Sequence, residues 1–252
     1  FYTGNYSLKV TRYTVNRKKP KDGTPPLRIC HISDLHNKKL PGNQTILRVL
    51  KNNVPDIVAI TGDAVNHDGG YPSRSLSLIK AINKKYPVYF ITGNHEFGFK
   101  FYEDFIRELK QMGVRVLNNE IVTKNIRNTK IFIGGIADLH FYDDDEDRYH
   151  NHIKKLQPEG HPFILLAHNP QFFPILKETT ADLILSGHTH GGQFRLPSGR
   201  GLFAPGQGFF PEYDSGRYVS GQSTMIVSRG IGPSTFPFRI MNRPEIAIIE
   251  LV

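Results

Sequence analysis

The stretch Asp56-Ile57-Val58-Ala59-Ile60-Thr61-Gly62-Asp63 decides the fold, because a short apolar run ends directly in a glycine and a carboxylate. An apolar run of this length, bounded by turn residues, is typical of a strand that is buried on both faces of a parallel sheet. Asp63 then lies at the carboxyl end of that strand. Open α/β sheets collect their binding and catalytic side chains at this edge, so Asp63 is a candidate site residue.

The same arrangement occurs on both sides of this stretch. Residues 27–33 are a predicted strand followed by Asp34 and His36, and residues 88–92 are a predicted strand followed by Asn94 and His95. Apolar residues at near-helical spacing predict helices over residues 43–53 and 73–85, between these strands. Two successive strand-helix-strand units of this kind place their connecting turns at one edge of a parallel sheet. The polar side chains at the turns are therefore predicted to converge.

Beyond residue 100 the pattern predicts a helix and then a second sheet. The helix is predicted over residues 101–112, and short strands over 114–117, 120–124, 130–134, 163–167, 181–186, 225–228 and 245–252. His168 follows one of these strands, and His188 and His190 follow the next. The acidic run 143–147 is interpreted as the N-terminus of a helix over residues 148–156, where negative charge is favourable, in preference to metal binding.

Composition points to one globular domain. The chain has 252 residues with 38% hydrophobic and 22% charged residues, and its longest apolar runs are the length of strands, not of membrane spans. We expect a single domain over residues 1–252, with an N-terminal strand or linker in 1–26 and the core in 27–252. The single Cys30 excludes an internal disulfide framework and a cysteine-rich zinc site.

The charge balance favours an anionic partner. Lys and Arg exceed Asp and Glu by 32 to 23, which gives a net charge of +9. This favours contact with nucleic acid, anionic membrane or cell-wall polymer. Ordinary solubility charge is an equal alternative, because the basic residues are scattered apart from Lys18, Lys19 and Lys21. No specific nucleic-acid motif is present, and a start at Phe1 leads us to expect a processed form that has lost a signal or anchor.

Seven side chains are candidate metal ligands. They are Asp34, His36, Asp63, Asn94, His168, His188 and His190. Each cluster alone is a weak signal, since Gly-Asp is a common turn and a single His after a strand is usually structural. Together they form a set of imidazole, carboxylate and amide groups that suits Mn, Fe, Co or Zn better than Mg or Ca. A carboxylate that bridges two ions offsets their repulsion, and Asp63 is the candidate for that role. Gly62, Gly93 and Gly187 are predicted to allow the sharp turns before these residues.

The order of these motifs resembles one enzyme superfamily. Asp34-Leu35-His36, Gly62-Asp63, Gly93-Asn94-His95-Glu96, His168 and Gly187-His188-Thr189-His190 are similar to the motifs of calcineurin-like metallophosphoesterases. The segments 32–37, 186–193, 228–232 and 244–245 further resemble a branch of bacterial membrane- or wall-associated phosphodiesterases, which is related to UDP-2,3-diacylglucosamine pyrophosphatases.

The resemblance implies a fold and a reaction. The fold would be a four-layer αββα sandwich of two mixed β-sheets flanked by helices. One metal would be held by Asp34, His36, Asp63 and His190, and a second by Asp63, Asn94, His168 and His188. Two divalent ions, with Mn²⁺ preferred over Fe, Zn or Co, would activate a bridging hydroxide for in-line attack on a phosphodiester or pyrophosphate. His95 would not be a ligand, and its imidazolium would assist the leaving group.

The sequence leaves two other functions open. The alternatives are a phosphomonoesterase, or a cell-surface protein that binds polyanionic polymer with incidental hydrolysis. The branch resemblance implies a membrane or wall location on the outer face, with a peripheral cytoplasmic location as the alternative. We expect Glu96 to support the ligands without binding metal. The aromatic residues in 208–211 and 234–238 are interpreted as buried core in preference to an apolar wall that contacts the substrate. For Arg229, a contact with the substrate phosphate and a structural ion pair are equal alternatives.

Overall fold

The computed structural model describes residues 7–18, 23–38, 43–233 and 238–252. Its first sheet has six strands in the order β1-β14-β2-β3-β4-β5. These strands are β1 (Lys9–Val15), β14 (Glu245–Leu251), β2 (Leu27–Ile32), β3 (Ile57–Thr61), β4 (Val88–Ile91) and β5 (Arg115–Val116). The strands from β2 to β5 are parallel, as the strand-helix-strand pattern predicts, and β14 is antiparallel to β2.

The second sheet also has six strands, in the order β12-β13-β9-β8-β7-β6. Its strands are β12 (Gly216–Ser220), β13 (Ser223–Val227), β9 (Leu183–Ser186), β8 (Phe163–Ala167), β7 (Thr129–Ile136) and β6 (Glu120–Ile126). The run from β13 to β7 is parallel, with an antiparallel strand at each edge. The predicted second sheet therefore begins at β6, because the segment around β5 pairs with β4 in the first sheet instead.

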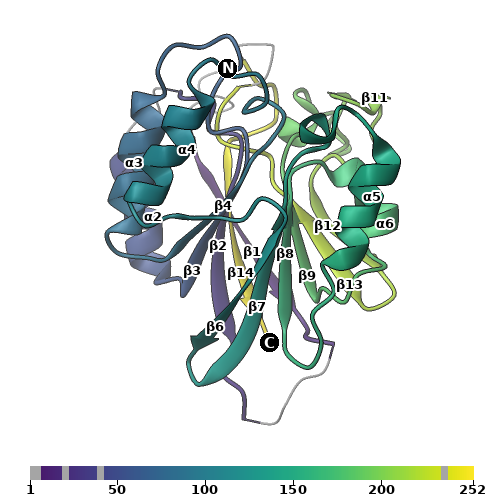
Figure 1. Ribbon diagram of the computed structural model, residues 1–252. Helices are drawn as coiled ribbons and strands as arrows, with labels where there is room; N and C mark the ends of the chain where they lie inside the picture. The colour runs from purple at the N-terminus through teal and green to yellow at the C-terminus, as the bar shows by residue number, and fades with distance from the viewer. Residues whose placement is uncertain (1–6, 19–22, 39–42, 234–237) are drawn as a thin grey trace.

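Helices cover the two outer faces, so that the molecule has four layers (Figure 1). On the first sheet lie α2 (Asn43–Asn53), α3 (Ser73–Asn83) and α4 (Tyr102–Gln111), and on the second lie α5 (Glu146–Lys155) and α6 (Phe173–Leu176). This is the sandwich that the resemblance implies. No helix in the described ranges is both long and apolar enough to cross a membrane.

Alternation along the strands explains why two sheets stack. In β2, Cys30 and Ile32 pack under the helices of the first sheet, whereas Leu27 and Ile29 point to the layer between the sheets. Ile133 of β7 and Leu166 of β8 meet that inner layer from the second sheet. Because both faces of the central strands are buried, their sequences read as continuous apolar runs.

Short elements at the carboxyl ends of the strands surround the site. They are the 3₁₀ turns η1 (Leu139–Tyr142), η2 (Pro170–Phe172) and η3 (His190–Gly192), and a ribbon of β10 (Phe203–Ala204) with β11 (Gly208–Phe209). The ribbon is tied to the site because the N–H of Leu202 donates to the carbonyl of Gly192 at 3.2 Å. After His190 the sequence pattern predicted named strands only over residues 225–228 and 245–252, so this ribbon is a finding of the structure.

Candidate metal centre

The seven predicted ligands come together where the two sheets meet at their carboxyl edges. They follow β2, β3 and β4 of the first sheet and β8 and β9 of the second. Two groups bring their ligand atoms within 4.8 Å of one another, one formed by Asp34, His36 and His190 and one by Asp63, His168 and His188. The convergence predicted from parallel strands therefore extends across both sheets.

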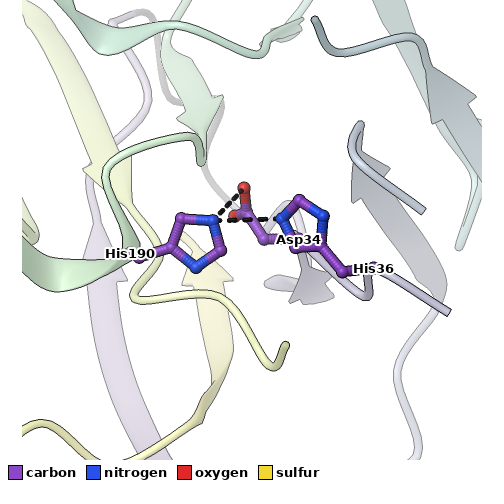
Figure 2. Close-up of side chains that lie close together, drawn as sticks. All are labelled: Asp34, His36 and His190. Carbon is purple, nitrogen blue, oxygen red and sulfur yellow. Dashed lines mark hydrogen bonds and ion pairs between the residues drawn. The ribbon is translucent and has the colours of Figure 1, made fainter. Parts of the chain in front are cut away.

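The first group lies between β2 and η3 (Figure 2). The Nε2 atoms of His36 and His190 are 3.1 Å apart, and Nε2 of His190 is 3.6 Å from Oδ1 of Asp34. All three side chains are buried. Two imidazole nitrogens and a carboxylate oxygen thus face one point, as ligands of a small divalent cation do.

The second group includes the predicted amide ligand. Nε2 of His168 lies 3.2 Å from Nδ1 of His188, and Oδ1 of Asn94 lies 2.8 Å from the same His188 nitrogen. Oδ2 of Asp63 is 3.3 Å from Nε2 of His168 and 3.8 Å from Nε2 of His36. Asp63 therefore lies between the two groups, which is the position that a bridging carboxylate needs.

Hydrogen bonds outside the groups fix which histidine nitrogen faces inward. Nδ1 of His36 donates to the carbonyl of Val65 at 3.2 Å, and Nδ1 of His168 donates to the carbonyl of Thr61 at 2.6 Å. Nδ1 of His190 is 3.3 Å from the carbonyl of Gly232. Each bond leaves the Nε2 lone pair free toward the centre, as in metal sites whose histidines are oriented by backbone carbonyls. The residues present therefore fit a pair of divalent ions.

The backbone at the ligands adopts a conformation that side chains usually avoid. The φ angle is positive at Asp34 (54°), His36 (50°), Asp63 (52°), His188 (71°) and His190 (48°). A non-glycine residue in the left-handed region carries strain that the surrounding structure must hold, and such positions concentrate at functional sites. No sequence pattern indicated this feature.

The three turns before the ligands use glycine for two different reasons. Gly62 has a φ of +86°, as the prediction of a sharp turn requires. Gly93 and Gly187 do not have positive φ, so that explanation is wrong for them. A Cβ at Gly187 would lie 2.6 Å from Oδ2 of Asp34 and even closer to Oγ of Ser33, and one at Gly93 would lie 2.8 Å from the His168 ring. These two glycines let the ligands approach the backbone.

The ligands differ in protonation. The Asp63 charge outweighs burial and holds the pKa of His168 well above its usual value, so these two residues form an ion pair, and burial raises the pKa of Asp34 to about 6. The other groups are already in the forms that bind a cation. Burial lowers the pKa of His36 and of His188 to about 4, so both rings are neutral near pH 7. Burial also acts against the Asp63 carboxylate, but the nearby His168 outweighs it and holds the pKa of Asp63 well below its usual range. Unprotonated imidazole and ionised carboxylate are the forms that ligate divalent metals.

His95 lies beside the first group, with its ring edge-on to His36 at a centroid distance of 4.6 Å. Ligand atoms of His36, Asp63 and His95 also lie within 4.8 Å of one another, so the assignment of His95 as a residue that binds no metal stays a prediction. The backbone N–H of His67 donates to Nδ1 of His95 at 3.1 Å. A nitrogen that accepts this bond carries no proton, so the geometry supports a neutral ring that donates from Nε2, not the imidazolium that we expected.

Glu96 supports the site as predicted. Its buried carboxylate accepts hydrogen bonds from the backbone N–H groups of Gly93, Asp63, Ala64 and Val65 at 2.7 to 3.3 Å. It thereby holds the turns after β3 and β4 together.

Sequence reasoning missed several buried polar residues around the site. Arg239 is 1% exposed, with Nη2 lying 3.2 Å from Nδ1 of His190, and Nδ2 of Asn242 donates to the His190 carbonyl at 2.6 Å. Asp138 and His140 form a close pair after β7. Asp138 could have been found, because it follows an apolar strand just as the predicted ligands do.

The aromatic segment after the last ligand corrects one expectation. Phe209 is 72% exposed, Phe210 is 50% exposed and Phe203 is 41% exposed, so these rings are not buried core. Antiparallel pairing in the β10–β11 ribbon puts Phe203 and Phe209 opposite each other, with ring centroids 5.5 Å apart, while their outer faces meet solvent. Residues 234–237 of the second aromatic segment lie outside the described residues, and the half-buried Phe238 packs against Phe194.

The structure gives a different outcome for each of three charged features, namely the acidic run 143–147, Lys18 and Arg229. Asp145 of the acidic run caps α5 by accepting from the Arg148 N–H, which confirms the helix-terminus interpretation. Nζ of Lys18 binds the Thr179 carbonyl and Ser223, so it serves the fold, while Lys19 and Lys21 lie outside the described residues. Within the described ranges the Arg229 guanidinium forms no ion pair, and its role as a phosphate contact stays a prediction.

Comparisons with known proteins identify the family. Residues 27–192 match the calcineurin-like phosphoesterase family, Metallophos. The chain is 32% identical to YpbG of Bacillus subtilis over 98% of this chain and 88% of that protein. It is 27% identical to the phosphodiesterase YaeI of Escherichia coli over 92% of this chain and 84% of that protein.

A solved structure supports the fold alone. The crystal structure of TT1561 from Thermus thermophilus matches with a TM-score of 0.55 and 11% identity, covering 82% of this chain and 91% of that one. Because the family match spans all seven candidate ligands and the homology extends nearly end to end, this chain belongs to the calcineurin-like phosphoesterase family and is a metallophosphoesterase.

Proposed function

We propose that this enzyme hydrolyses phosphodiester or pyrophosphate bonds with two divalent metal ions. The observation that carries the proposal is the position of Asp63, whose Oδ2 lies 3.8 Å from His36 and 3.3 Å from His168, one histidine of each group. Asp34, His36, Asp63 and His190 would hold one ion, and Asp63, Asn94, His168 and His188 the other. Bound there, the ions would supply a nucleophilic water at neutral pH and neutralise charge on the phosphoryl group.

The protein groups around the ions would orient the reaction. The buried carboxylates and imidazoles would hold the ions, and Nδ1 of His36 and of His168 is already fixed to a backbone carbonyl. His95, with Nε2 free to donate, would hydrogen-bond the phosphoryl or leaving oxygen as charge develops on it. Manganese is our proposed resident ion, since mixed imidazole and carboxylate ligands suit it; iron, zinc and cobalt share that preference.

The exposed aromatics support a substrate with an apolar part. Phe209 lies on the β10–β11 ribbon, and the N–H of Phe210, the next residue, donates to the carbonyl of Leu202, whose own N–H donates to Gly192, two residues after His190. The Arg200 guanidinium lies 5.7 Å from the Phe210 ring centroid, so positive charge accompanies the apolar surface. We propose that this rim contacts a lipid or sugar substituent of an anionic phosphodiester, and that the enzyme works at a membrane or wall surface.

A hydrolysis panel tests the proposal. The purified chain with Mn²⁺ is offered bis-aryl phosphodiesters, aryl phosphomonoesters, nucleoside diphosphate sugars and cyclic nucleotides. We expect turnover of diesters or pyrophosphates that chelator abolishes and Mn²⁺ restores, and none by Asp63→Ala. Monoester preference would support the alternative phosphatase. Retention of polyanionic polymer that survives chelation and falls steeply with salt, without hydrolysis, would support the polymer-binding alternative.

A further inference from the structure

Asp138 and His140 form a hydrogen-bonded pair in which Asp138 is buried and His140 is partly exposed. The proposed mechanism gives neither residue a role so far. Nδ1 of His140 lies 2.6 Å from Oδ1 of Asp138, and the His140 backbone N–H donates to the same oxygen. The Asp138 side chain is 2% exposed, whereas that of His140 is 46% exposed. An imidazole that is anchored by a buried carboxylate and open to solvent can exchange protons with a bound molecule.

The pair lies at the same sheet edge as the metal ligands. β7 is parallel to β8, with Ile136 opposite Ala167. Asp138 lies just after the end of β7, and His168 lies just after the end of the neighbouring β8. The charges of His168 and His188 both act on Asp138. Oδ2 of Asp138 is buried and has no hydrogen-bond partner within the described part of the chain. Asp138 is therefore held next to the second group of ligands.

A chain of contacts connects His140 with His95. The His140 ring packs against Phe97 with centroids 5.9 Å apart, and Nδ1 of His67 donates to the Phe97 carbonyl at 2.8 Å. The N–H of His67 in turn donates to Nδ1 of His95. Phe97 is 39% exposed and the His140 side chain is 46% exposed, so both rings are open to solvent, and the charge of Asp63 acts on His140.

The two histidines differ in what binds their Nδ1 atoms. Nδ1 of His95 accepts an N–H, which favours the neutral ring, whereas Nδ1 of His140 faces a carboxylate, which favours the imidazolium. The hydrogen bond to Asp138 raises the pKa of His140, burial lowers it, and the charges of Asp138, Asp144 and Asp63 raise it again, with a net increase. A protonated imidazole at neutral pH is the form that can give up a proton.

We propose that His140 is the general acid of the reaction and that Asp138 is its positioning residue. This rests on the proposed phosphodiester hydrolysis. As the bond from phosphorus to the leaving oxygen breaks, the Nε2 proton of His140 passes to that oxygen. The ring is left neutral, with Nδ1–H still bound to Asp138, and solvent returns the proton. His95 then acts as a neutral hydrogen-bond donor to the phosphoryl group.

The leaving group provides the sharpest test. Alkoxide leaving groups need a proton, whereas p-nitrophenolate leaves without one. In His140→Asn we expect kcat on a methyl or other alkyl phosphodiester to fall by about 10²- to 10⁴-fold, as for loss of a general acid. Turnover of bis(p-nitrophenyl) phosphate should change by only a few-fold. The matched control is His152→Asn on α5, whose ring contacts Tyr142 away from the ligand groups.

A second measurement does not depend on turnover. Histidine ¹⁵N chemical shifts of the metal-free protein, assigned with His140→Asn, give the pKa of His140 directly. We expect a pKa above the ordinary 6.5 in the wild type and a lower one in Asp138→Asn, with the basic limb of the activity profile moving to lower pH in the same variant.

The outcomes separate the inference from the proposed function. If the wild type hydrolyses diesters and His140→Asn loses nothing, or loses alkyl and p-nitrophenyl turnover equally, His140 is not the general acid. An unchanged His140 pKa in Asp138→Asn would remove Asp138 from its positioning role. If the wild type hydrolyses no phosphoester with any divalent ion, the proposed function itself is wrong and the inference falls with it.

Discussion

The Glu96 carboxylate accepts the backbone N–H of Asp63 at 2.9 Å, although the two residues are 33 positions apart in the chain. The same carboxylate binds the N–H of Gly93, which opens the turn that carries Asn94. One side chain therefore fixes the position of the Asp63 carboxylate relative to Asn94, the proposed amide ligand.

This relationship predicts that Glu96→Ala weakens both folding and metal binding. The change leaves buried N–H groups without an acceptor, which costs about 1–3 kcal/mol for each group that water does not reach. Loss of such outer hydrogen bonds typically lowers metal affinity by about 10- to 100-fold. Denaturant unfolding and titration calorimetry with Mn²⁺ measure the two effects. Glu103→Ala on the exposed side of α4 is the control, and equal behaviour of the two variants would contradict the role of Glu96.

Substitution of Asp63 and substitution of His95 are predicted to affect different properties, metal binding in the first case and turnover alone in the second. Asp63→Ala removes the carboxylate between the two groups of ligands, so the purified protein should lose bound metal as well as turnover. His95→Asn should keep its metal and lose about 10²- to 10⁴-fold in turnover, because a hydrogen-bond donor to the reacting group is missing. Metal content by mass spectrometry and steady-state kinetics distinguish the cases. Metal loss in His95→Asn would instead identify His95 as a ligand.

Gly187→Ala tests the close approach of backbone and ligand. The new methyl group would lie 2.6 Å from Oδ2 of Asp34, so the first group of ligands must shift and metal affinity should fall at least about tenfold. Gly70→Ala is a matched control, since nothing lies within 4 Å of a Cβ there and its φ is not positive. Mn²⁺ calorimetry on both variants gives the comparison, and equal affinities would show that the site tolerates the methyl group.

His31 predicts how stability depends on pH. Burial lowers the pKa of His31 to about 3, and its Nε2 lies 2.8 Å from Oγ1 of Thr61. Below pH 6.5 the unfolded chain therefore binds a proton here that the folded chain does not. This term leaves stability unaffected above pH 6.5 and lowers it as pH falls from 6.5 toward 3, by at most about 1.4 kcal/mol per pH unit.

The prediction is checked with His31→Gln, which keeps a polar group near Thr61 but cannot take up the proton. Urea unfolding of the metal-free proteins between pH 4.5 and 7.5 should give a shallower loss of stability on the acid side for the variant. Parallel curves would mean that His31 does not contribute to the pH dependence.

The exposed ribbon predicts selectivity between substrates. Phe209→Ala should raise KM for a lipid-linked diester while sparing a small aryl diester, because an apolar contact with the substituent is lost and the ligands are untouched. Stability should change little, since the Phe209 side chain is 72% exposed. Steady-state kinetics on both substrates measure the ratio. A loss of activity that is equal for the two substrates would contradict contact with the apolar substituent.

Local pattern determined much of this protein. The apolar run 57–61 and its neighbours fixed the parallel strands, because strands that are buried on both faces need continuous apolar sequence. The turns after those strands place Asp34, Asp63 and Asn94 at one edge of the sheet. The expectation that Glu96 supports the ligands agrees with its hydrogen bonds to the backbone N–H groups of Gly93 and Asp63.

Contacts between distant segments follow from the packing of the folded chain and not from local pattern. The tertiary structure paired β14 with β1 and β2, placed Arg239 against His190, and showed that Phe209 is exposed, none of which spacing along the chain can specify. It also joined Asp138 to His140 beside His168, because the register of β7 against β8 sets which strand ends are neighbours. The sequence by itself determined which residues reach the sheet edge, and the packing of one sheet on the other determined which of them meet.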